Sequence, residues 1–397
     1  MTNPDRLAVV GAGIRWTSRG LDLETQRWAD QLSARGITRG DRVAHLSPIA
    51  PGTVALTHAI WRLGAVTVPL NTRLTAVELA PQLEALSPRL TLVDPAFADR
   101  RSLEGERPRR PFTPRADSTA AILFTSGTTG RPKAAALSHA NLLAAARASA
   151  QNIGGSPDDR WLLCLPLFHV GGLTMLHRCA TYGAALFLHD RFDAEAVSHA
   201  IDSDGITHIS LVATTLRRVL DARAGRPFPP TLRAILIGGG PVPAPLLARA
   251  KDLGAPVLQT YGLTESCAQV TTERPGEADG LTAGPSLPGL QVRIVDAQGA
   301  SLPPGATGEI EVSGPTVFQG YVDDESETHQ ILWKGWLRTR DLGSLDDRGR
   351  LSVAARRTDL IISGGENVYP AEVESVVLSA PGILEAAVVA RPDDEWG

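Results

Sequence analysis

The sequence has little cysteine, no signal-peptide pattern in its first ten residues and no long apolar run. Its 397 residues include 3 cysteines, whose spacing matches neither a zinc site nor a disulfide framework, so we expect a reducing compartment. Residues 1–10 lack the basic start and apolar core of a signal peptide. No apolar run reaches the roughly 20 residues that a membrane-spanning helix needs. These absences predict a cytoplasmic protein that does not span a membrane.

An excess of basic charge is also missing. The chain carries 39 basic and 43 acidic residues, so its net charge is −4, and the overall charge does not favour nucleic acid as the main partner. Arginines do cluster within residues 107–115, but prolines lie between them. A solvated linker is the simpler interpretation of that stretch, and a phosphate-binding patch is the alternative.

The overall amino-acid composition, with 43% hydrophobic and 21% charged residues, is typical of a globular protein. Helical periodicity covers residues 21–36, where Gly36 is expected to end the helix, and residues 52–64. We expect short strands at 41–46, 65–69, 90–94 and 120–124, with a linker over 95–117. This alternation predicts an α/β fold of layers with mostly parallel strands.

The pattern changes from residue 290 onward. Short β runs separated by Asp, Gly and Pro turns predict a mainly β subdomain. A strand at 360–363, a helix at 370–379 and a strand at 385–390 are expected to begin a further small α/β unit. A chain of this length exceeds one ordinary core, so we expect two or three domains or subdomains. The last unit is too small to bury a core of its own.

A nine-residue loop with the sequence TSGTTGRPK, at 125–133, is the strongest local signal. Its glycines let the backbone curl so that amides point at phosphate oxygens, while four hydroxyls and Lys133 add donors and a cation. The spacing Gly-x-x-Gly-x-x-Lys differs from the common nucleotide-triphosphatase loop. The pattern favours phosphate binding over a solvated turn. The candidate residues before Lys133 are Thr125, Ser126, Gly127, Thr128, Thr129 and Gly130.

Two further segments indicate a nucleotide site. The run Gly238–Gly240 directly follows an apolar strand and would let a flat ligand approach the backbone, although a strained strand-to-helix turn is the alternative. In the second segment Tyr261 offers an aromatic face, Thr264 offers a hydroxyl to phosphate, and Glu265 offers a hard oxygen suited to Mg²⁺. A capped turn is the alternative for this second segment.

Taken together, these motifs resemble the adenylate-forming superfamily of acyl-CoA synthetases, luciferases and peptide-synthetase adenylation domains. The loop at 125–133 matches the signature of that superfamily, and five more segments match in the same order: Pro166–His169, Gly238–Pro241, Tyr261–Glu265, Trp336–Gly343 and Arg356–Glu374. The resemblance covers nearly the whole chain. It implies a large N-terminal domain of two mixed or parallel sheets flanked by helices, over 1–355, with a β-rich subdomain at about 285–355. A hinge at 356–359 and the start of a small α+β C-terminal domain at 360–397 would follow.

The resemblance also implies a site for ATP and Mg²⁺. Gly238, Gly239, Gly240 and Pro241 would lie along the adenine ring, near Tyr261 and Gly262. Asp341 would accept the ribose hydroxyls and Arg356 would also hold the ribose, whereas a turn-forming role is the alternative for Asp341. Lys133, Thr264 and Glu265 would act on the phosphates, with Glu265 as the metal ligand. Two positions depart from the family pattern, because Arg340 and Ala355 stand where glycine is usual. Arg340 could strain the turn or crowd the site.

The resemblance implies three candidate contacts for the acid substrate: His169, Arg178 and Gly239. In similar acyl-CoA synthetases this histidine sits by the reacting carboxylate, and peptide-synthetase domains carry Asp there, which argues against an amino-acid substrate. A packed core histidine is the alternative. The segments 165–173, 188–193 and 236–243 look most like the o-succinylbenzoate–CoA ligases of menaquinone biosynthesis, with short- or medium-chain fatty acyl-CoA ligases as the alternative. Arg178 could then hold a second substrate carboxylate, unless it is an exposed helix charge.

The resemblance finally implies two chemical steps separated by a domain rotation. The acid would form an acyl-adenylate, and coenzyme A would then displace AMP. Thr358 and Asp359 would form the hinge, and Gly364 and Gly365 would help form the pantetheine tunnel. In the family the small domain runs further and supplies a lysine to the first step, whereas the last lysine here is Lys334. A fragment, a natural truncation or a need for a complementing chain would each explain this. A homologue that binds nucleotide or acid with weakened catalysis is the alternative function, and homodimers are common in the family.

Overall fold

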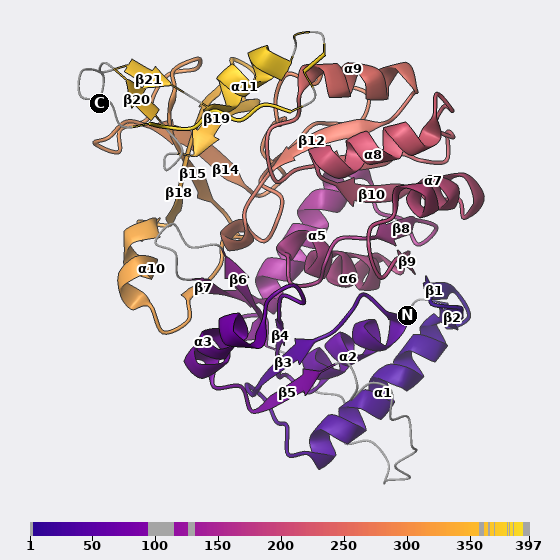
Figure 1. The fold of residues 1–397 in the computed structure, drawn as a ribbon. Helices are drawn as coiled ribbons and strands as arrows, with labels where there is room; N and C mark the ends of the chain where they lie inside the picture. The colour runs from indigo at the N-terminus through magenta and orange to yellow at the C-terminus, as the bar shows by residue number, and fades with distance from the viewer. Residues whose placement is uncertain are drawn as a thin grey trace.

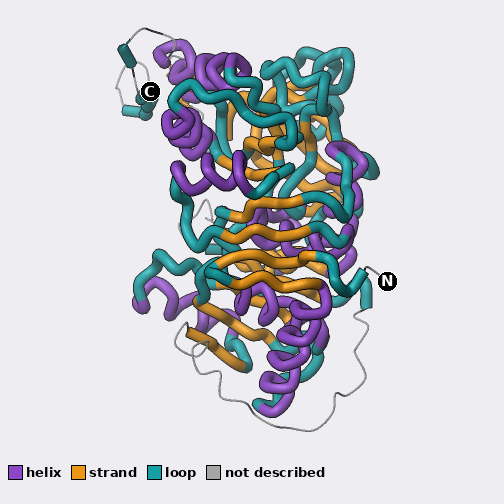
Figure 2. The backbone as a smooth tube through the Cα atoms, turned by 90° about the vertical axis from the view of Figure 1, so that its right-hand side faces the viewer, coloured by secondary structure: helices purple, strands orange, loops and turns teal. Residues whose placement is uncertain are grey.

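The computed structural model describes residues 3–93, 115–125, 132–356, 361–363, 366–368, 370–378, 380, 382–383 and 385–391. Within this part, the chain forms two large sheets flanked by helices and a smaller antiparallel sheet (Figure 1). After a 90° turn, the strands are seen stacked down the middle of the molecule with helices beside them (Figure 2). The predicted α/β fold with a β-rich subdomain is confirmed.

The first sheet has the strand order β16-β7-β6-β4-β3-β5. Its parallel strands are β3 Arg42–Leu46, β4 Val66–Pro69, β5 Leu90–Val93 and β6 Thr119–Thr125. β7 Lys133–Ser138 pairs antiparallel with β6, and β16 Gly320–Tyr321 pairs antiparallel with β7. The four strands predicted here each lie within one residue of their expected bounds.

Helices cover both faces of this sheet. α1 Ser18–Ala34 and α2 Pro51–Arg62 pack on the face that carries Val43, and α3 Ala76–Leu86 packs on the face that carries Ala44. Neighbouring strand residues point to opposite faces, so the sheet is buried on both sides. Helix α1 begins three residues earlier than predicted because Thr17 caps it, and it ends before Gly36 as expected.

The sequence analysis did not predict α3. Pro81 lies inside this helix and interrupts the usual helical signal. Thr75 and Glu78 nevertheless form a capping box, in which each side chain accepts a hydrogen bond from the other residue's backbone N–H. A threonine followed three positions later by glutamate is a sequence signal for a helix start, and it would have identified α3.

The second sheet has the order β13-β12-β11-β10-β8-β9-β1-β2. Its strands are β1 Leu7–Gly11, β2 Ile14–Thr17, β8 Arg160–Leu163, β9 Ala185–Leu188, β10 His208–Leu211, β11 Ala234–Ile237, β12 Val257–Tyr261 and β13 Thr271–Thr272. One face packs on α7 Ala194–Ser203, α8 Ala213–Arg223 and α9 Ala244–Asp252, and the other on α5 His139–Ile153 and α6 Val170–Tyr182. Because β8 to β12 run parallel, their carboxyl ends meet at one edge, where ligands bind in open α/β sheets.

The third sheet is antiparallel and follows residue 290. It consists of β14 Gln291–Val295, β15 Gly308–Ser313, β17 Leu332–Trp333, β18 Trp336–Leu345 and β19 Leu351–Arg356, with α10 Glu325–Ile331 before β17. The turn expected before Asp341 is instead a local irregularity within the continuous strand β18, opposite Glu309 and Glu311. Arg340 has a φ of +62° at this point. The sequence pattern therefore located the backbone distortion but not the strand that contains it.

The remaining described residues include β20 Ile361–Ser363, β21 Glu366–Val368 and α11 Pro370–Leu378. The strand at 360–363 and the helix at 370–379 were predicted, and both are present. The strand expected at 385–390 is wrong, because these residues have no regular secondary structure. A strand needs a partner for its backbone groups, and the described part of the chain supplies none here. None of the helices in the described ranges combines the length and apolarity needed to cross a bilayer.

Candidate active site

The predicted phosphate loop joins the ends of the β6–β7 hairpin. Thr125 pairs with Lys133 across that hairpin, and its hydroxyl donates a hydrogen bond of 3.5 Å to the Lys133 carbonyl. The structure thus fixes the two ends of the loop opposite each other. The loop residues Ser126, Gly127, Thr128, Thr129 and Gly130 lie outside the described residues, so their phosphate contacts stay predictions.

The glycine run after β11 lies beside the end of β12. Ile237 pairs with Gln259, so residue 238 and Thr260 are neighbours on parallel strands. A Cβ added to Gly238 would lie 3.1 Å from Thr260 Cγ2, and Gly239 has a φ of +83°, which favours glycine. Gly240 has no such constraint, since no atom outside its chain neighbours would lie within 4 Å of its Cβ. The strained-turn alternative is therefore correct for the backbone, and contact with adenine stays a prediction.

Tyr261 and Asp341 join β12 to β18. The Tyr261 hydroxyl donates a hydrogen bond of 2.7 Å to Asp341 Oδ2, and both side chains are buried. The Asp341 N–H in turn donates to Thr339 Oγ1 at 3.1 Å. The alternative of a turn-forming aspartate is wrong, because Asp341 lies within a strand and below the surface. The structure thus brings together two of the residues that the sequence predicts around the nucleoside.

A tight turn positions Thr264 and Glu265 after β12. A Cβ on Gly262 would lie 1.3 Å from the Ala268 carbonyl oxygen, so only glycine allows the chain to fold back here. Ser266 Oγ accepts a hydrogen bond of 3.0 Å from the Leu263 N–H and closes the turn. The capped-turn alternative is therefore correct for the local structure. It is compatible with the functional prediction, since the short helix Thr264–Ser266 holds both predicted phosphate-site residues.

Glu265 receives a hydrogen bond from a residue that the sequence analysis missed. The Tyr321 hydroxyl donates to Glu265 Oε1 at 2.6 Å, and the Phe318 N–H donates to the Glu265 carbonyl at 2.8 Å. Burial, followed by the charge of Glu265, raises the pKa of the Tyr321 hydroxyl, so Tyr321 stays protonated and donates. The Tyr321 ring stands edge-on to Phe318. Glu265 is thus held at both its backbone and its side chain.

The donor set around Glu265 suits a metal ion that is shared with a substrate. Among the described residues, no group of three or more His, Cys, Asp or Glu side chains is placed to hold a metal. Mg²⁺ typically takes one or two carboxylates from the protein and completes its shell with phosphates and water. Glu265 fits this role, because its carboxylate is a hard oxygen donor held by Tyr321, whose ring centre lies 5.5 Å from Lys133 Nζ.

Lys133 lies in an ion cluster that was also not predicted. Its Nζ is 2.6 Å from Glu327 Oε1, and an Arg340 guanidinium nitrogen is 2.8 Å from the same oxygen. Burial would raise the pKa of the Glu327 carboxyl, but its contact with the Lys133 ammonium and the charge of Arg340 outweigh it and leave that pKa below its usual value. Glu327 lies on α10, which Figure 1 shows beside the β6–β7 end of the first sheet. The pairing of Tyr321 with Ala135 brings this distant segment to Lys133.

His169 lies at the start of α6, as its N-cap. Its side chain is exposed, so the packed-core alternative is wrong. Partial loss of solvent around the ring, followed by the charge of Arg73, lowers the pKa of His169, so that its imidazole is neutral at neutral pH. A Cβ on Gly172 would lie 2.3 Å from the Pro166 carbonyl oxygen, so glycine allows the helix to begin against the preceding turn.

Arg178 lies on the same helix but is only 6% exposed, so the alternative of an exposed helix charge is wrong. It donates a hydrogen bond of 2.8 Å to Gln269 Oε1, and its guanidinium stacks over the Trp161 ring at 4.7 Å. Burial lowers the pKa of Arg178 to about 10. Nine residues separate it from His169, about 14 Å along the helix and half a turn around it. This spacing sets the two residues well apart along α6, and the role of Arg178 stays a prediction.

The remaining predicted site residues lie between positions 356 and 365, in the C-terminal part of the chain. Arg356 ends β19 and pairs with Asp341 across the ladder, which places its backbone beside the predicted ribose ligand. The hinge residues Thr358 and Asp359 and the tunnel residues Gly364 and Gly365 lie outside the described residues.

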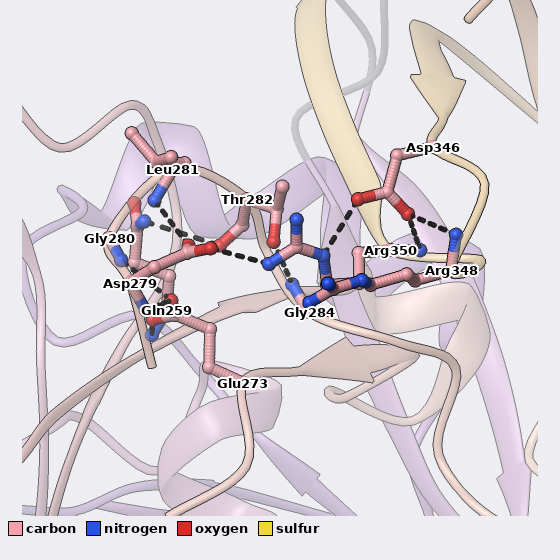
Figure 3. Close-up of polar contacts among 10 residues, drawn as sticks. All are labelled: Gln259, Glu273, Asp279, Gly280, Leu281, Thr282, Gly284, Asp346, Arg348 and Arg350. Carbon is pink, nitrogen blue, oxygen red and sulfur yellow. Dashed lines mark hydrogen bonds and ion pairs between the residues drawn. The ribbon is translucent and has the colours of Figure 1, made fainter. Parts of the chain in front are cut away.

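A polar network joins β12 to the turn between β18 and β19 (Figure 3). The Glu273 carboxylate accepts backbone hydrogen bonds from Gln259 at 2.7 Å and from Gly280 at 2.9 Å. Arg350 pairs with Asp279 in the same loop and, at 2.7 Å, with Asp346 in the β18–β19 turn. This network ties β12, which ends at Tyr261, to the sheet that carries Asp341. The sequence analysis missed it, because no local motif links these segments.

Comparison with known proteins agrees with this fold. The family model of AMP-binding enzymes matches residues 1–322, so the chain belongs to the AMP-binding enzyme family. Among curated relatives, it is 40% identical to the 2-succinylbenzoate–CoA ligase of Bacillus licheniformis, over 99% of this chain and 85% of the relative. The corresponding protein of Bacillus thuringiensis is 39% identical, over 99% of this chain and 84% of the relative.

Solved structures give the same result. The o-succinylbenzoate CoA synthetase from Bacillus subtilis, in complex with its acyl-adenylate intermediate, superposes with a TM-score of 0.92 at 38% identity, over 100% of this chain and 84% of that one. ATP-bound MatB from Rhodopseudomonas palustris superposes with a TM-score of 0.93 at 31% identity, over 100% of this chain and 85% of that one. The adenylate-forming fold predicted from the sequence is therefore confirmed.

Proposed function

We propose that this protein is an acid–thiol ligase that activates o-succinylbenzoate with ATP and passes it to coenzyme A. The observation that supports this most is identity of about 39% to 2-succinylbenzoate–CoA ligases over 99% of the chain. The site supports it as well: the Tyr261 hydroxyl at the end of β12 bonds Asp341, and the Tyr321 ring links Glu265, which it bonds, to Lys133, whose Nζ lies 5.5 Å from the ring centre.

In the first step a substrate carboxylate oxygen attacks the α-phosphorus of ATP, and the bond to the pyrophosphate oxygen breaks. Tyr261 and Asp341 orient the nucleoside, and Lys133 and Thr264 bind phosphate oxygens. Glu265 would hold Mg²⁺, which would supply positive charge to the phosphates. Catalysis of this step is mainly positioning and charge neutralisation.

In the second step the sulfur of coenzyme A attacks the acyl carbon, and the bond from that carbon to the AMP oxygen breaks. We propose that His169 lies beside the acyl group in both steps. Its neutral imidazole carries no charge that would hold the carboxylate back from attack. A rotation about Thr358 and Asp359 between the steps, with Gly364 and Gly365 along the pantetheine path, completes the proposal.

We propose the domain boundaries 1–355, 356–359 and 360–397 for the large domain, the hinge and the start of the small domain. A cytoplasmic location, without nucleic acid as a partner, is part of the same proposal. Cys164, Cys179 and Cys267 are all unpaired and buried, as expected in a reducing compartment. A homodimer is tested by light scattering of the purified protein.

The experiment is a measurement of acid-dependent pyrophosphate release from ATP and Mg²⁺. The acids are o-succinylbenzoate and a panel of short and medium fatty acids and aromatic acids, with Asp341→Ala as the inactive comparison. Release with o-succinylbenzoate alone supports the proposal. Release with a fatty acid instead would assign the protein to the alternative fatty acyl-CoA ligases. ATP binding without release for any acid would favour the weakened homologue.

A further inference from the structure

One carboxylate oxygen is shared by two cations next to the phosphate loop. Glu327 Oε1 lies 2.6 Å from Lys133 Nζ and 2.8 Å from an Arg340 guanidinium nitrogen. The side chains of Lys133 and Glu327 are only 11% and 14% exposed, so water screens these charges less than it screens a surface pair. The three groups form one electrostatic unit.

The charge of this unit depends on Arg340. Lys133 and Glu327 alone would form a neutral pair, and the lysine would then attract an incoming phosphate weakly. With Arg340 present, the unit of two cations and one anion carries a net charge of +1. Both cations compete for the same oxygen, so neither is fully neutralised. An anion that reaches Lys133 therefore meets positive charge.

The backbone at Arg340 is held in a conformation that arginine rarely adopts. Its φ is +62°, in the left-handed region that glycine enters readily, and its N–H donates to Glu309 Oε1 at 3.2 Å. Strained residues of this kind persist where the surrounding structure holds them, and they cluster at functional sites. The position immediately precedes Asp341, so its backbone geometry also sets the direction of that side chain.

We propose that Arg340 is a positioning residue that offsets the charge of Glu327, so that Lys133 presents net positive charge to the triphosphate of ATP. This inference rests on the proposed function. It also gives a physical reason for an arginine at a position where similar enzymes carry glycine. In this chain Arg340, in place of the usual glycine, offsets the negative charge of Glu327. The replacement therefore does not by itself impair the site.

The test compares binding of Mg·ATP and of adenosine to the full chain by calorimetry. Arg340→Gly should weaken Mg·ATP binding about tenfold, through loss of one cation from a sheltered cluster. Adenosine, which carries no phosphate, should bind as it does to the wild type. Arg340→Lys keeps the charge and should retain most of the ATP affinity, which a purely structural role for arginine would not allow.

The double variant Arg340→Gly with Glu327→Ala tests whether Arg340 acts on ATP binding through Glu327. Removing Glu327 leaves Lys133 without its neutralising partner, so ATP affinity should return to within about twofold of the wild type. The matched control is Arg338→Ala on the same strand, whose Nε lies 3.3 Å from Glu311 Oε1 and whose side chain is similarly exposed. This variant loses the same charge from a different ion pair and should bind ATP normally. Thermal unfolding of each variant verifies that it is folded.

Equal ATP affinity for the wild type and Arg340→Gly would overturn the inference while leaving the proposed function intact. Failure of the double variant to regain affinity would also overturn it, because the loss would then not pass through Glu327. If the wild type itself binds no Mg·ATP, the proposed function and this inference are both wrong.

Discussion

Replacing Tyr321 by phenylalanine removes the hydroxyl that holds the predicted metal ligand. In the structure this hydroxyl donates to Glu265 Oε1 at 2.6 Å. A hydrogen bond to a charged group contributes about 1.5–3 kcal/mol to stability. Because Tyr321 and Glu265 are both partly exposed, water replaces part of the bond, and we expect a loss of about 1 kcal/mol in the free energy of unfolding.

The effect on function should be larger than the effect on stability. Loss of a hydrogen bond that orients a metal-binding carboxylate typically lowers metal affinity or activity by about 10–100-fold. We therefore expect Tyr321→Phe to need at least about tenfold more Mg²⁺ for half-maximal acid-dependent pyrophosphate release. The assay is a Mg²⁺ titration at saturating ATP and acid.

The matched control is Tyr182→Phe, which removes a hydroxyl that donates only a long bond of 3.4 Å to the Ala146 carbonyl, between α5 and α6. This variant should keep the wild-type Mg²⁺ requirement. An unchanged Mg²⁺ requirement in Tyr321→Phe would refute the reasoning, because it would show that Tyr321 does not orient the metal ligand.

Three further predictions follow, two on stability and one on ATP binding. Burial lowers the pKa of His45 and of His58 to about 4, so the unfolded state, with a pKa near 6.5, binds more protons between these values. Stability should therefore fall by up to about 3 kcal/mol per histidine as the pH drops from 6.5 to 4, as urea unfolding at several pH values would measure; a constant midpoint would contradict this. Gly262→Ala should destabilise by on the order of 3 kcal/mol, because its Cβ would overlap a carbonyl oxygen, whereas Gly240→Ala, in open space, should be nearly neutral in thermal unfolding. Arg350→Gln should weaken ATP binding only a few-fold, since Arg350 acts on the link between β12 and the β18–β19 turn, and a total loss measured by calorimetry would place it in direct contact with the nucleotide.

The parts of the site that the sequence predicted follow from parallel strand geometry. β11 and β12 are adjacent, so the glycine run after one and the Tyr261 segment after the other must meet at the same sheet edge. Each segment also carries its own local signal, such as the glycine at 262 that a close backbone approach requires. Short-range chemistry and strand order were therefore enough to place these residues.

The parts that the sequence did not predict depend on contacts between distant segments. Tyr321 and Glu327 reach Lys133 because β16 pairs with β7, and no local pattern encodes that pairing. The expected turn before Asp341 became a distortion inside β18, because the neighbouring strand β15 continues past it. Sequence patterns report the conformation of one segment, whereas pairing between distant strands is decided by the packing of the whole molecule.

The most direct test of the central claim is mass spectrometry of the products formed from o-succinylbenzoate, ATP and Mg²⁺, before and after coenzyme A is added. The account predicts an o-succinylbenzoyl-adenylate in the first sample, with release of one pyrophosphate for each adenylate, and the coenzyme A thioester in the second. ATP that stays intact with o-succinylbenzoate, under conditions in which the protein demonstrably binds Mg·ATP, would contradict the account.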